Sequence, residues 1–228
     1  TNEEEYLKSA VSDFERLMEP EIEATRYVSD VPIGELVPRR LLPFFEKKYT
    51  HLNPMQAEAL PLVLEHRENL LIGAETGTGK TLLAELAALN ELQQNPKAKI
   101  LYTAPMKAIT VEKEEEWSRL QDLDVEVYKI TGDEDTVDVD KAKGAHILLS
   151  TGEKWDSMTR KPHRFPFVKD ISLMVVDEIH ILDDDDRGAT MEALLSRMKR
   201  FTPDARILGL SATMKNIDVL AHWLNAKK

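Results

Sequence analysis

A glycine-rich turn between an apolar run and a leucine- and alanine-rich segment constrains this 228-residue chain more than any other feature. Residues 74–81 read Ala-Glu-Thr-Gly-Thr-Gly-Lys-Thr. The run 69–72 before them predicts a buried strand, and the segment 82–92 after them predicts a helix. Strand, turn and helix in this order are the context of a phosphate-binding loop. The alternative is a strand–helix turn that binds no ligand, and the flanking elements favour the loop.

Each residue type in this turn suits a phosphate-binding task. Gly77 and Gly79 let the backbone curl so that its N–H groups point at phosphate oxygens, and the helix N-terminus adds partial positive charge. Lys80 is placed to reach the β- and γ-phosphates, and the Thr81 hydroxyl to bind Mg²⁺. The first position of the G-x-x-x-x-G-K-[ST] pattern is Ala74, which is small enough to be acceptable there.

Apolar segments alternate with helical patterns from residue 53 onward, which predicts an α/β fold with a mostly parallel sheet flanked by helices. The expected strands are 69–73, 99–104, 125–130, 146–150, 172–177 and 206–210. Ligands of such a sheet bind beyond the carboxyl ends of the strands, and every expected end is polar or contains glycine. Upstream, the spacing of apolar residues predicts an amphipathic helix over 3–18, and four prolines predict an irregular lead-in over 19–43.

The composition suits one large intracellular enzyme domain, since 42% of the residues are apolar. The absence of cysteine excludes a disulfide scaffold, a zinc–thiolate site and a cysteine nucleophile. No apolar run approaches the roughly 20 residues that span a bilayer, and no signal peptide heads the chain. We therefore expect no membrane partner and an intracellular location, cytoplasmic or nuclear. The chain begins with Thr1 rather than Met, which suggests a piece of a longer protein.

The net charge of −11 argues against a nucleic-acid partner, because polyanions attract basic surfaces. Eight acids against Lys8 and Arg16 give residues 1–25 a charge of −6, which leaves −5 for the rest. Most of that remainder comes from two acidic clusters, at 112–116 and at 183–186, and we interpret the second as a solvated loop. A groove that is locally basic, or is built from backbone and hydroxyl donors, is compatible with this charge.

A second group of candidate catalytic residues is Asp177-Glu178-Ile179-His180, which follows the apolar run 173–176. A carboxylate at the end of an apolar strand, 97 residues after Lys80, suits the magnesium partner of a phosphate loop. Glu178 beside it can accept a proton from water that attacks the γ-phosphate. The alternative is an acidic strand end that caps a helix, which leaves the phosphate loop without its usual metal partner.

Taken together, these segments resemble the first RecA-like domain of superfamily 2 helicases, specifically of the superkiller (Ski)-type branch, which is of the DExH type. That branch includes an archaeal DNA-repair helicase and spliceosomal helicases. The resemblance covers about residues 30–228, preceded by a helical extension over 1–30. Its motifs, in chain order, are Asn-Pro-Met-Gln (53–56), the turn 74–81, Ala-Pro-Met-Lys-Ala (104–108), Thr-Gly-Asp (131–133), Asp-Glu-Ile-His (177–180) and Ser-Ala-Thr (211–213). The family's Thr-Pro-Glu-Lys motif appears as Thr151-Gly152-Glu153-Lys154, without the proline.

The resemblance implies ATP and Mg²⁺ as cofactors. Gln56 would read the edge of adenine, and Tyr49 or Phe45 would pack on the base, with core packing as the alternative for Phe45. The other nucleotide-binding residues would be Glu75, Thr76, Gly77, Thr78, Gly79, Lys80 and Thr81. Thr81 and Asp177 would hold the metal ion.

The same resemblance implies roles in catalysis and in nucleic-acid binding. Glu178 would be the general base, and His180 would link the ATP site to the coupling residues Ser211 and Thr213. Contacts to a single strand would come mainly through phosphates, which do not encode sequence. The residues concerned would be Lys107, Thr131, Gly132, Thr151, Lys154 and Arg187, with a structural ion pair as the alternative for Arg187. Trp155 would anchor a helix or, less simply, stack on a base.

Members of this family hydrolyse ATP between two RecA-like domains, and the second domain supplies arginines to the γ-phosphate. No such motif follows Thr213, so we expect this chain to be the nucleotide-binding half of an ATP-dependent helicase acting on DNA or RNA, with little activity alone. The alternatives are a P-loop ATPase switch of another family and a nucleotide-binding scaffold without catalysis. Intact Lys80, Thr81, Asp177 and Glu178 argue against the scaffold. The sequence indicates no oligomeric state.

Overall fold

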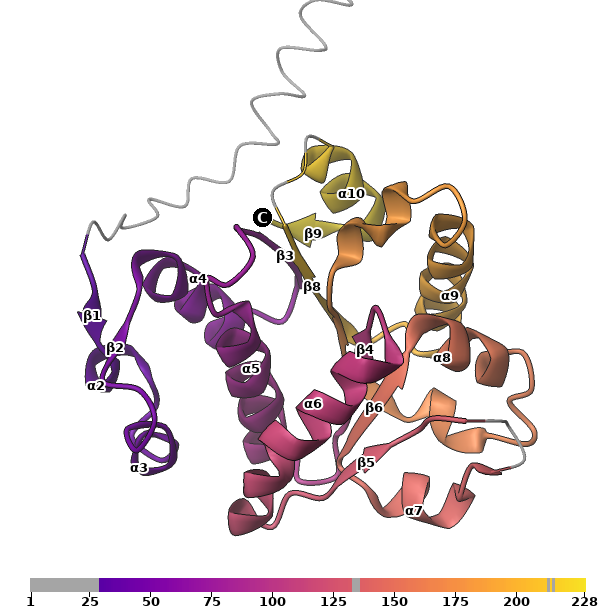
Figure 1. Ribbon diagram of the computed structural model, residues 1–228, viewed down its shortest axis with the longest axis horizontal. Coiled ribbons are helices and arrows are strands. Elements are labelled where there is room, and N and C mark those ends of the chain that lie inside the picture. Colours follow the sequence, from indigo (N-terminus) through magenta and orange to yellow (C-terminus); the bar gives the residue numbers. More distant parts are fainter. Residues whose placement is uncertain (1–28, 133–135, 213, 215) are drawn as a thin grey trace, which may run out of the picture.

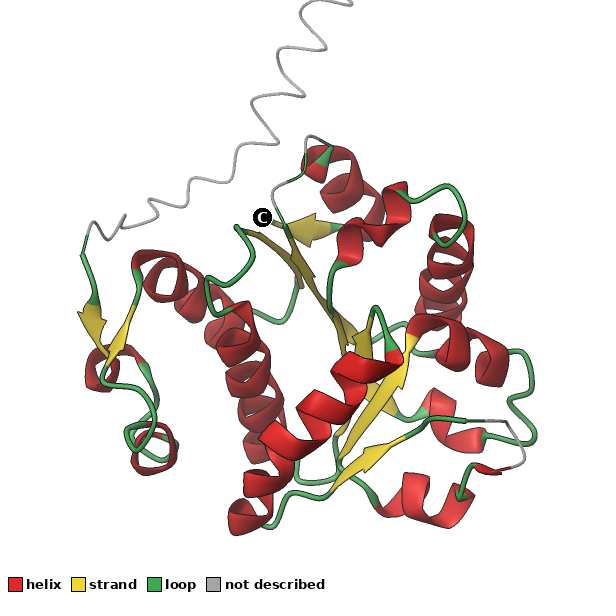
Figure 2. Ribbon diagram, viewed as in Figure 1, coloured by secondary structure: helices red, strands yellow, loops and turns green. Residues whose placement is uncertain are grey.

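The computed structural model describes residues 29–132, 136–212, 214 and 216–228, and the helix predicted over 3–18 lies outside these ranges. The predicted α/β fold is confirmed. A seven-stranded sheet of order β5-β6-β4-β7-β8-β3-β9 crosses the domain, and every strand pair in it is parallel (Figure 1). Helices cover both faces of this sheet (Figure 2).

The strands of the large sheet are β3 (Asn69–Gly73), β4 (Lys99–Ala104), β5 (Val127–Lys129), β6 (Ile147–Thr151), β7 (Ile171–Val176), β8 (Arg206–Ser211) and β9 (Ala226–Lys227). Five of the six predicted strands are confirmed to within one residue at each end. The prediction for 125–130 was too long, because a 3₁₀ turn comes directly before it and the Val125 N–H bonds to Leu120 O at 3.2 Å. The two-residue strand β9 is too short to leave a periodic pattern, and it exists because it pairs with β3.

The helices are α2 (Ile33–Leu36), α3 (Leu42–Phe45), α4 (Pro54–Glu65), α5 (Lys80–Gln94), α6 (Lys107–Trp117), α7 (Val139–Gly144), α8 (Gly152–Thr159), α9 (Gly188–Phe201) and α10 (Ile217–Leu224). Three 3₁₀ turns lie wholly within the described ranges: η1 (Ser118–Leu123), η3 (Pro166–Lys169) and η4 (Ile179–Asp183). The described part of the lead-in is more regular than predicted. It contains α2, α3 and strand β1 (Val31–Pro32), which pairs antiparallel with β2 (His51–Leu52).

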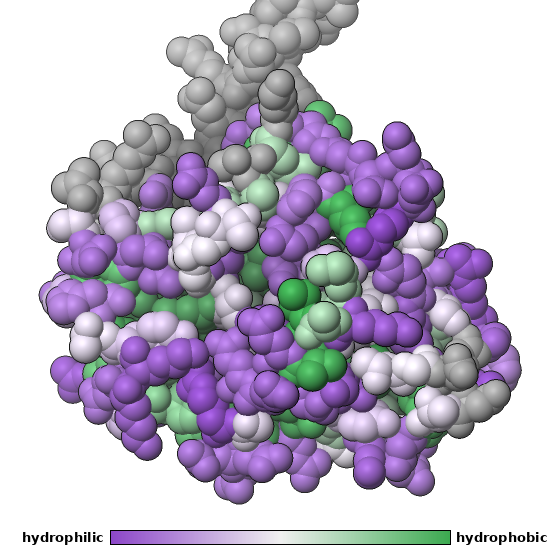
Figure 3. Space-filling model, viewed as in Figure 1, coloured by the Kyte–Doolittle hydropathy of each residue, from purple (hydrophilic) through white to green (hydrophobic). Residues whose placement is uncertain are grey.

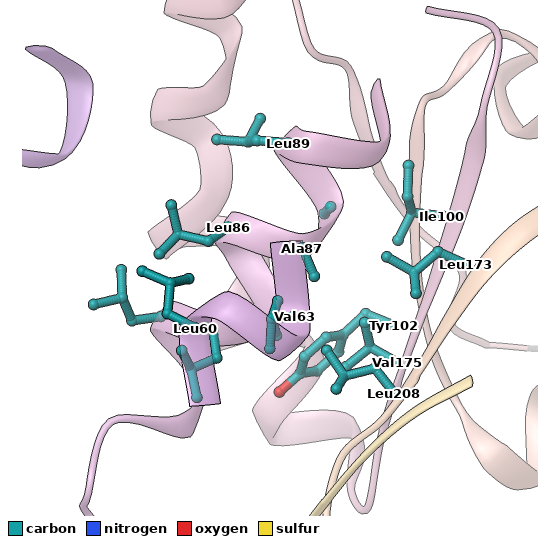
Figure 4. Packing of buried hydrophobic residues seen from close by; sticks show 14 of the residues in the cluster. Leu60, Val63, Leu86, Ala87, Leu89, Ile100, Tyr102, Leu173, Val175 and Leu208 are labelled. Carbon is teal, nitrogen blue, oxygen red and sulfur yellow. The ribbon is translucent and has the colours of Figure 1, made fainter. Parts of the chain in front are cut away.

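Alternation along the strands divides the apolar residues into two cores, one on each face of the sheet. On β7, for example, Leu173 and Val175 pack with α4, α5 and α6, whereas Met174 and Val176 pack with α8, α9 and α10. Figure 4 shows the first core, where Leu60 and Val63 of α4 approach the strand side chains. Because both faces are covered, the only exposed parts of the inner strands are their ends.

The described residues give little sign of an apolar docking site on their surface. Figure 3 shows one face, which is largely hydrophilic with small, separate apolar patches. Within the described ranges, the exposed large apolar residues are Met106, Val111, Leu123 and Val219, and single exposed apolar residues are normal on a protein surface. Among the described residues, no helix combines the length and the apolar character needed to cross a membrane.

Candidate active site at the carboxyl edge of the sheet

The strand order divides the carboxyl edge of the sheet into two halves. The ends of β3, β8 and β7 are neighbours, and they carry the glycine-rich loop 74–79, Ser211 and Asp177. The ends of β4, β6 and β5 form the other half, and they lead into Lys107, Thr151 and Gly132. Residues that the sequence analysis assigned to nucleotide and to nucleic acid therefore lie on separate halves of one edge.

The glycine-rich loop curls around its own lysine. Gly77 and Gly79 have φ values of 84° and 78°, in the left-handed region that favours glycine. The buried Lys80 ammonium donates to the carbonyls of Ala74 at 2.7 Å and Glu75 at 2.9 Å. Helix α5 begins at Lys80 with Gly79 as its N-cap, and no side chain caps it. Its first N–H groups are thus open to an anionic ligand, which is the arrangement that binds phosphate.

Gln56 ties this loop to the start of α4. Asn53 caps α4, and its backbone N–H donates to Gln56 Oε1 at 3.0 Å while Gln56 N–H donates back to Asn53 Oδ1. The Gln56 amide also donates to Gly79 O at 3.1 Å, and the Asn53 amide donates to Thr78 O at 2.9 Å. An amide has two N–H groups and two acceptor lone pairs, so these two bonds use one N–H and one lone pair of Gln56. The pattern N-x-x-Q predicts this capping box, which the sequence analysis overlooked.

A hollow of about 610 Å³ opens beside Gln56, Gly79 and Thr81. Tyr49 lines it, whereas Phe45 is completely buried in the core, so only Tyr49 is positioned to pack on a base. The facing wall is charged and comes from α6 and from Lys48, which follows α3. Glu116 accepts from Lys113 at 2.6 Å and from Lys48 at 3.0 Å. Burial raises the pKa of Glu116, but hydrogen bonds from these two lysines outweigh it and hold the pKa below its usual value.

Asp177 lies at the end of β7 with both carboxylate oxygens in use. Oδ1 accepts the backbone N–H of Glu178 at 3.1 Å, and Oδ2 accepts the hydroxyl of Tyr102 at 2.5 Å. Tyr102 is fully buried inside β4. Tyr102 was not among the predicted site residues, because a tyrosine within an apolar strand gives no local indication that its hydroxyl binds a carboxylate.

Glu178 has an unusual backbone, with φ at 51°, where a residue with a side chain is strained. Its Oε2 lies 3.2 Å from His180 Nδ1 but has no hydrogen-bond partner. The Ala212 N–H donates to His180 Nδ1 at 3.4 Å. His180 also lies 3.5 Å from Ser211 Oγ, while Thr213 lies outside the described residues.

These features fit a nucleotide with a divalent cation. The glycine-rich loop leads into a helix end without a side-chain cap, and its lysine donates to neutral carbonyls. A carboxylate oxygen without a hydrogen-bond donor, Glu178 Oε2, follows β7, which is separated from β3 by β8 alone. Oxygen ligands from a hydroxyl and a carboxylate are those that Mg²⁺ prefers. Thr81 and Asp177 are the residues that would hold the ion.

A second hollow of about 550 Å³ occupies the other half of the edge. Five of the six residues predicted to touch a single strand line it, and Thr131 does not. The lining consists of Pro105, Met106, Lys107, Gly132, Thr151, Glu153, Lys154 and Arg187. The Arg187 guanidinium donates to Glu153 Oε1 at 2.8 Å and also to Pro105 O. The ion pair that was the alternative for Arg187 is therefore present. Lys107 and Lys154 are the other two cationic side chains that line this hollow.

Thr151 and Gly152 explain how the loop keeps its shape without the family's proline. The Thr151 hydroxyl accepts the Lys154 N–H at 3.3 Å and caps α8, which begins at Gly152. A side chain at Gly152 would come within 2.6 Å of the Met191 methyl group. Trp155 on the same helix is fully buried, so stacking on a base is excluded for it.

The run of four aspartates before α9 is an exposed loop, as predicted. Asp184 Oδ1 accepts the N–H groups of Asp186 at 3.0 Å and Arg187 at 2.9 Å, which leads the chain into the helix. Over the part of the chain that the structure describes, no cluster of three or more acidic or histidine side chains could hold a metal ion.

Comparison with known proteins agrees with this geometry. The family model of the DEAD/DEAH box helicase matches residues 53–220. The probable ATP-dependent DNA helicase HFM1 of Xenopus tropicalis is 33% identical across 98% of this chain and 18% of that protein. ATP-dependent DNA helicase Hel308 of Pyrococcus horikoshii is 41% identical across 78% of this chain and 24% of its own length. ATP-dependent DNA helicase MER3 of Saccharomyces cerevisiae is 38% identical across 78% of this chain and 15% of its own length. The chain thus spans less than a quarter of each relative.

Proposed function

This chain belongs to the DEAD/DEAH box helicase family, in the Ski-type branch of superfamily 2, and from that premise we propose how its site works. We propose that it binds Mg–ATP beside the glycine-rich loop and a single strand of nucleic acid in the hollow of Lys107 and Lys154. The observation that carries this proposal is the strand order. Strand β8 lies between β3 and β7, so the loop that leads to Lys80 and the turn that contains Glu178 follow strands with a single strand between them.

In this mechanism the protein holds the nucleotide before any chemistry takes place. The open N–H groups of α5 and the Lys80 ammonium bind the phosphates, replacing the carbonyl contacts of Lys80. Mg²⁺, when bound, neutralises charge on the phosphate oxygens, with Thr81 and Asp177 as its protein partners. Glu178 accepts the proton of the attacking water, for which its donor-free Oε2 is suited.

His180 is the proposed link between the nucleotide and the end of β8. Its Nδ1 already contacts the backbone N–H of Ala212 and lies near Ser211 Oγ. A change in the position of Glu178 therefore reaches the end of β8 through one imidazole ring. Coupling to nucleic acid through Ser211 and Thr213 is part of this proposal.

The complete motor includes more than this chain. We propose that a second RecA-like domain closes over the nucleotide and adds arginines, which in phosphoryl transfer are typically worth about 10³–10⁵ in rate. DNA is the first strand to test, because the relatives named above are DNA helicases. An intracellular location belongs to the same proposal, since both ATP and nucleic acid are found there.

Calorimetry with Mg–ADP and Mg–ATP, followed by turnover in the full-length protein, tests the proposal. Lys80→Ala should weaken nucleotide binding at least tenfold, whereas Lys97→Ala, an exposed lysine at the opposite end of the sheet, should not. Glu178→Gln should keep binding intact while turnover falls by about 10²–10⁴. GTP that binds as tightly as ATP would contradict the role of Gln56. Normal turnover of Glu178→Gln would mean that another group activates the water.

A further inference from the structure

The Tyr102 hydroxyl binds Asp177, the carboxylate that the proposed function assigns to the metal ion. Its O–H donates to Asp177 Oδ2 at 2.5 Å, across 75 positions of sequence. The two strands are neighbours in the sheet, with Tyr102 opposite Val175. Alternate residues share a face, so Tyr102, Val175 and Asp177 all point to the face covered by α5 and α6.

The tyrosine ring has little freedom to leave this position. It is completely buried, and Trp117 at the end of α6 packs edge-on against it, with ring centres 5.2 Å apart and planes at 73°. Figure 4 shows the ring beside Val175 and Leu208, with its hydroxyl pointing away from the strand backbone. Packing of the ring in the core therefore fixes the direction of the hydroxyl.

The Tyr102 hydroxyl is a donor to Asp177, because a carboxylate oxygen can only accept this hydrogen bond. A phenol has a single proton to give. With Tyr102 on Oδ2 and the Glu178 N–H on Oδ1, each carboxylate oxygen has one donor, and rotation of the Asp177 carboxylate breaks both bonds.

We propose that Tyr102 is a positioning residue, which holds the Asp177 carboxylate in the orientation that receives the nucleotide-bound magnesium ion. The inference rests on the proposed function, because it assigns the metal to Asp177. Groups that orient metal ligands in this way typically change metal affinity by about 10–100-fold when they are removed. The competing explanation is that Tyr102 merely fills the core and finds Asp177 as a convenient partner.

The test is Tyr102→Phe in the full-length protein, which removes one oxygen and keeps the ring. ADP binding is measured by calorimetry with EDTA and then with Mg²⁺, and Mn²⁺ binding to the ADP complex is measured by electron paramagnetic resonance. We expect the gain in ADP affinity due to Mg²⁺, and the Mn²⁺ affinity, to fall at least tenfold. ADP binding in EDTA should stay within about twofold of the unsubstituted protein, which also shows that the variant is folded.

Tyr128→Phe is the matched control, because the Tyr128 hydroxyl accepts only the backbone N–H of Asp138 at 3.2 Å on the other half of the molecule. It should leave all three measurements unchanged. Unchanged metal dependence in Tyr102→Phe would overturn the inference. An equal loss of ADP affinity with and without Mg²⁺ would also overturn it, because that is the result of a purely structural role. Failure of the unsubstituted protein to bind ADP would instead overturn the proposed function.

Discussion

Buried ionisable side chains in this domain have different hydrogen-bond partners, and the partners determine what each side chain can do. Lys80 and Lys99 are both buried, yet Lys80 donates to two carbonyls of the glycine-rich loop, whereas Lys99 donates to three carbonyls at the end of α7. Glu85 on α5 is 1% exposed and pairs with Arg119 at 2.5 Å. The residue type alone does not distinguish these three situations.

Glu85 should make the stability of the domain depend on pH. Burial raises its pKa from 4.5 to about 7, although Arg119 opposes the change. Between these two values the folded state binds more protons than the unfolded state, so the free energy of unfolding falls as the pH rises through this window. The loss is complete above the folded pKa and amounts to about 3 kcal/mol.

Urea denaturation at several pH values between 4.5 and 8 measures this effect. The unsubstituted protein should lose stability relative to Glu85→Gln as the pH rises, because glutamine does not titrate. Glu46→Gln, at an exposed position, serves as the control and should follow the unsubstituted protein. If Glu85→Gln had the same pH dependence as the unsubstituted protein, the carboxyl group would titrate normally.

At the scale of elements, helix ends differ in whether a side chain bonds to their unpaired backbone groups. Arg206 donates to the carbonyls of Leu62 and Val63 at the end of α4, and Lys99 donates to Ala142, Lys143 and Ala145 at the end of α7. These cations satisfy carbonyls that a helix terminus leaves unpaired. Helix α5 instead begins without a side-chain cap, which leaves that end to a ligand.

Lys99→Met should therefore destabilise the domain by about 2–3 kcal/mol, because two buried carbonyls and one part-buried carbonyl lose a charged donor. Lys97→Met, two residues earlier and exposed, should change the stability by less than about 0.5 kcal/mol. Chemical denaturation of both variants gives the comparison. Equal stability of the two variants would mean that α7 does not need this cap.

At the scale of the whole molecule, the strand order separates the two regions proposed to bind nucleotide and nucleic acid. The half proposed for the nucleotide has a buried lysine and open N–H groups, whereas the other half has Lys107 and Lys154 beside the Arg187–Glu153 pair. A protein with a net charge of −11 can hold a polyanion only through such local positive charge. Lys154 also donates to Gly132 O at 3.0 Å, which fixes it at the rim of the hollow.

Replacing Lys107 and Lys154 together by alanine should weaken binding of single strands similarly for every sequence. It should also reduce the slope of log K against log salt by about 0.7 for each phosphate that the protein no longer neutralises. ATP binding should not change, because the glycine-rich loop lies on the other half of the edge. The measurement is fluorescence anisotropy of a labelled oligonucleotide over a series of salt concentrations, in the full-length protein.

Lys97→Ala with Lys143→Ala is the matched control, since it removes the same charge near the amino ends of β4 and β6. It should leave both affinity and salt slope unchanged. If the two double variants behaved alike, the effect would come from net charge, and the hollow of Lys107 and Lys154 would not be the path of the strand.

The amino-acid sequence alone determined the local units of this protein. Strand β3, the glycine-rich loop and helix α5 follow from periodicity, from glycines with φ near 80° and from a lysine at a fixed spacing, all within 26 residues. The same is true of the carboxylates after β7. Such patterns are readable because neighbouring residues in the chain are also neighbours in space.

Only the tertiary structure decided which of these units meet. It placed β8 between β3 and β7, bound Gln56 to Gly79, and brought the Tyr102 hydroxyl to Asp177. It also paired Arg187 with Glu153, where the sequence left two alternatives open. The physical reason is the same in each case: these contacts join residues 23 to 75 positions apart, and they depend on how whole faces of helices and strands pack together. No short stretch of sequence carries that information.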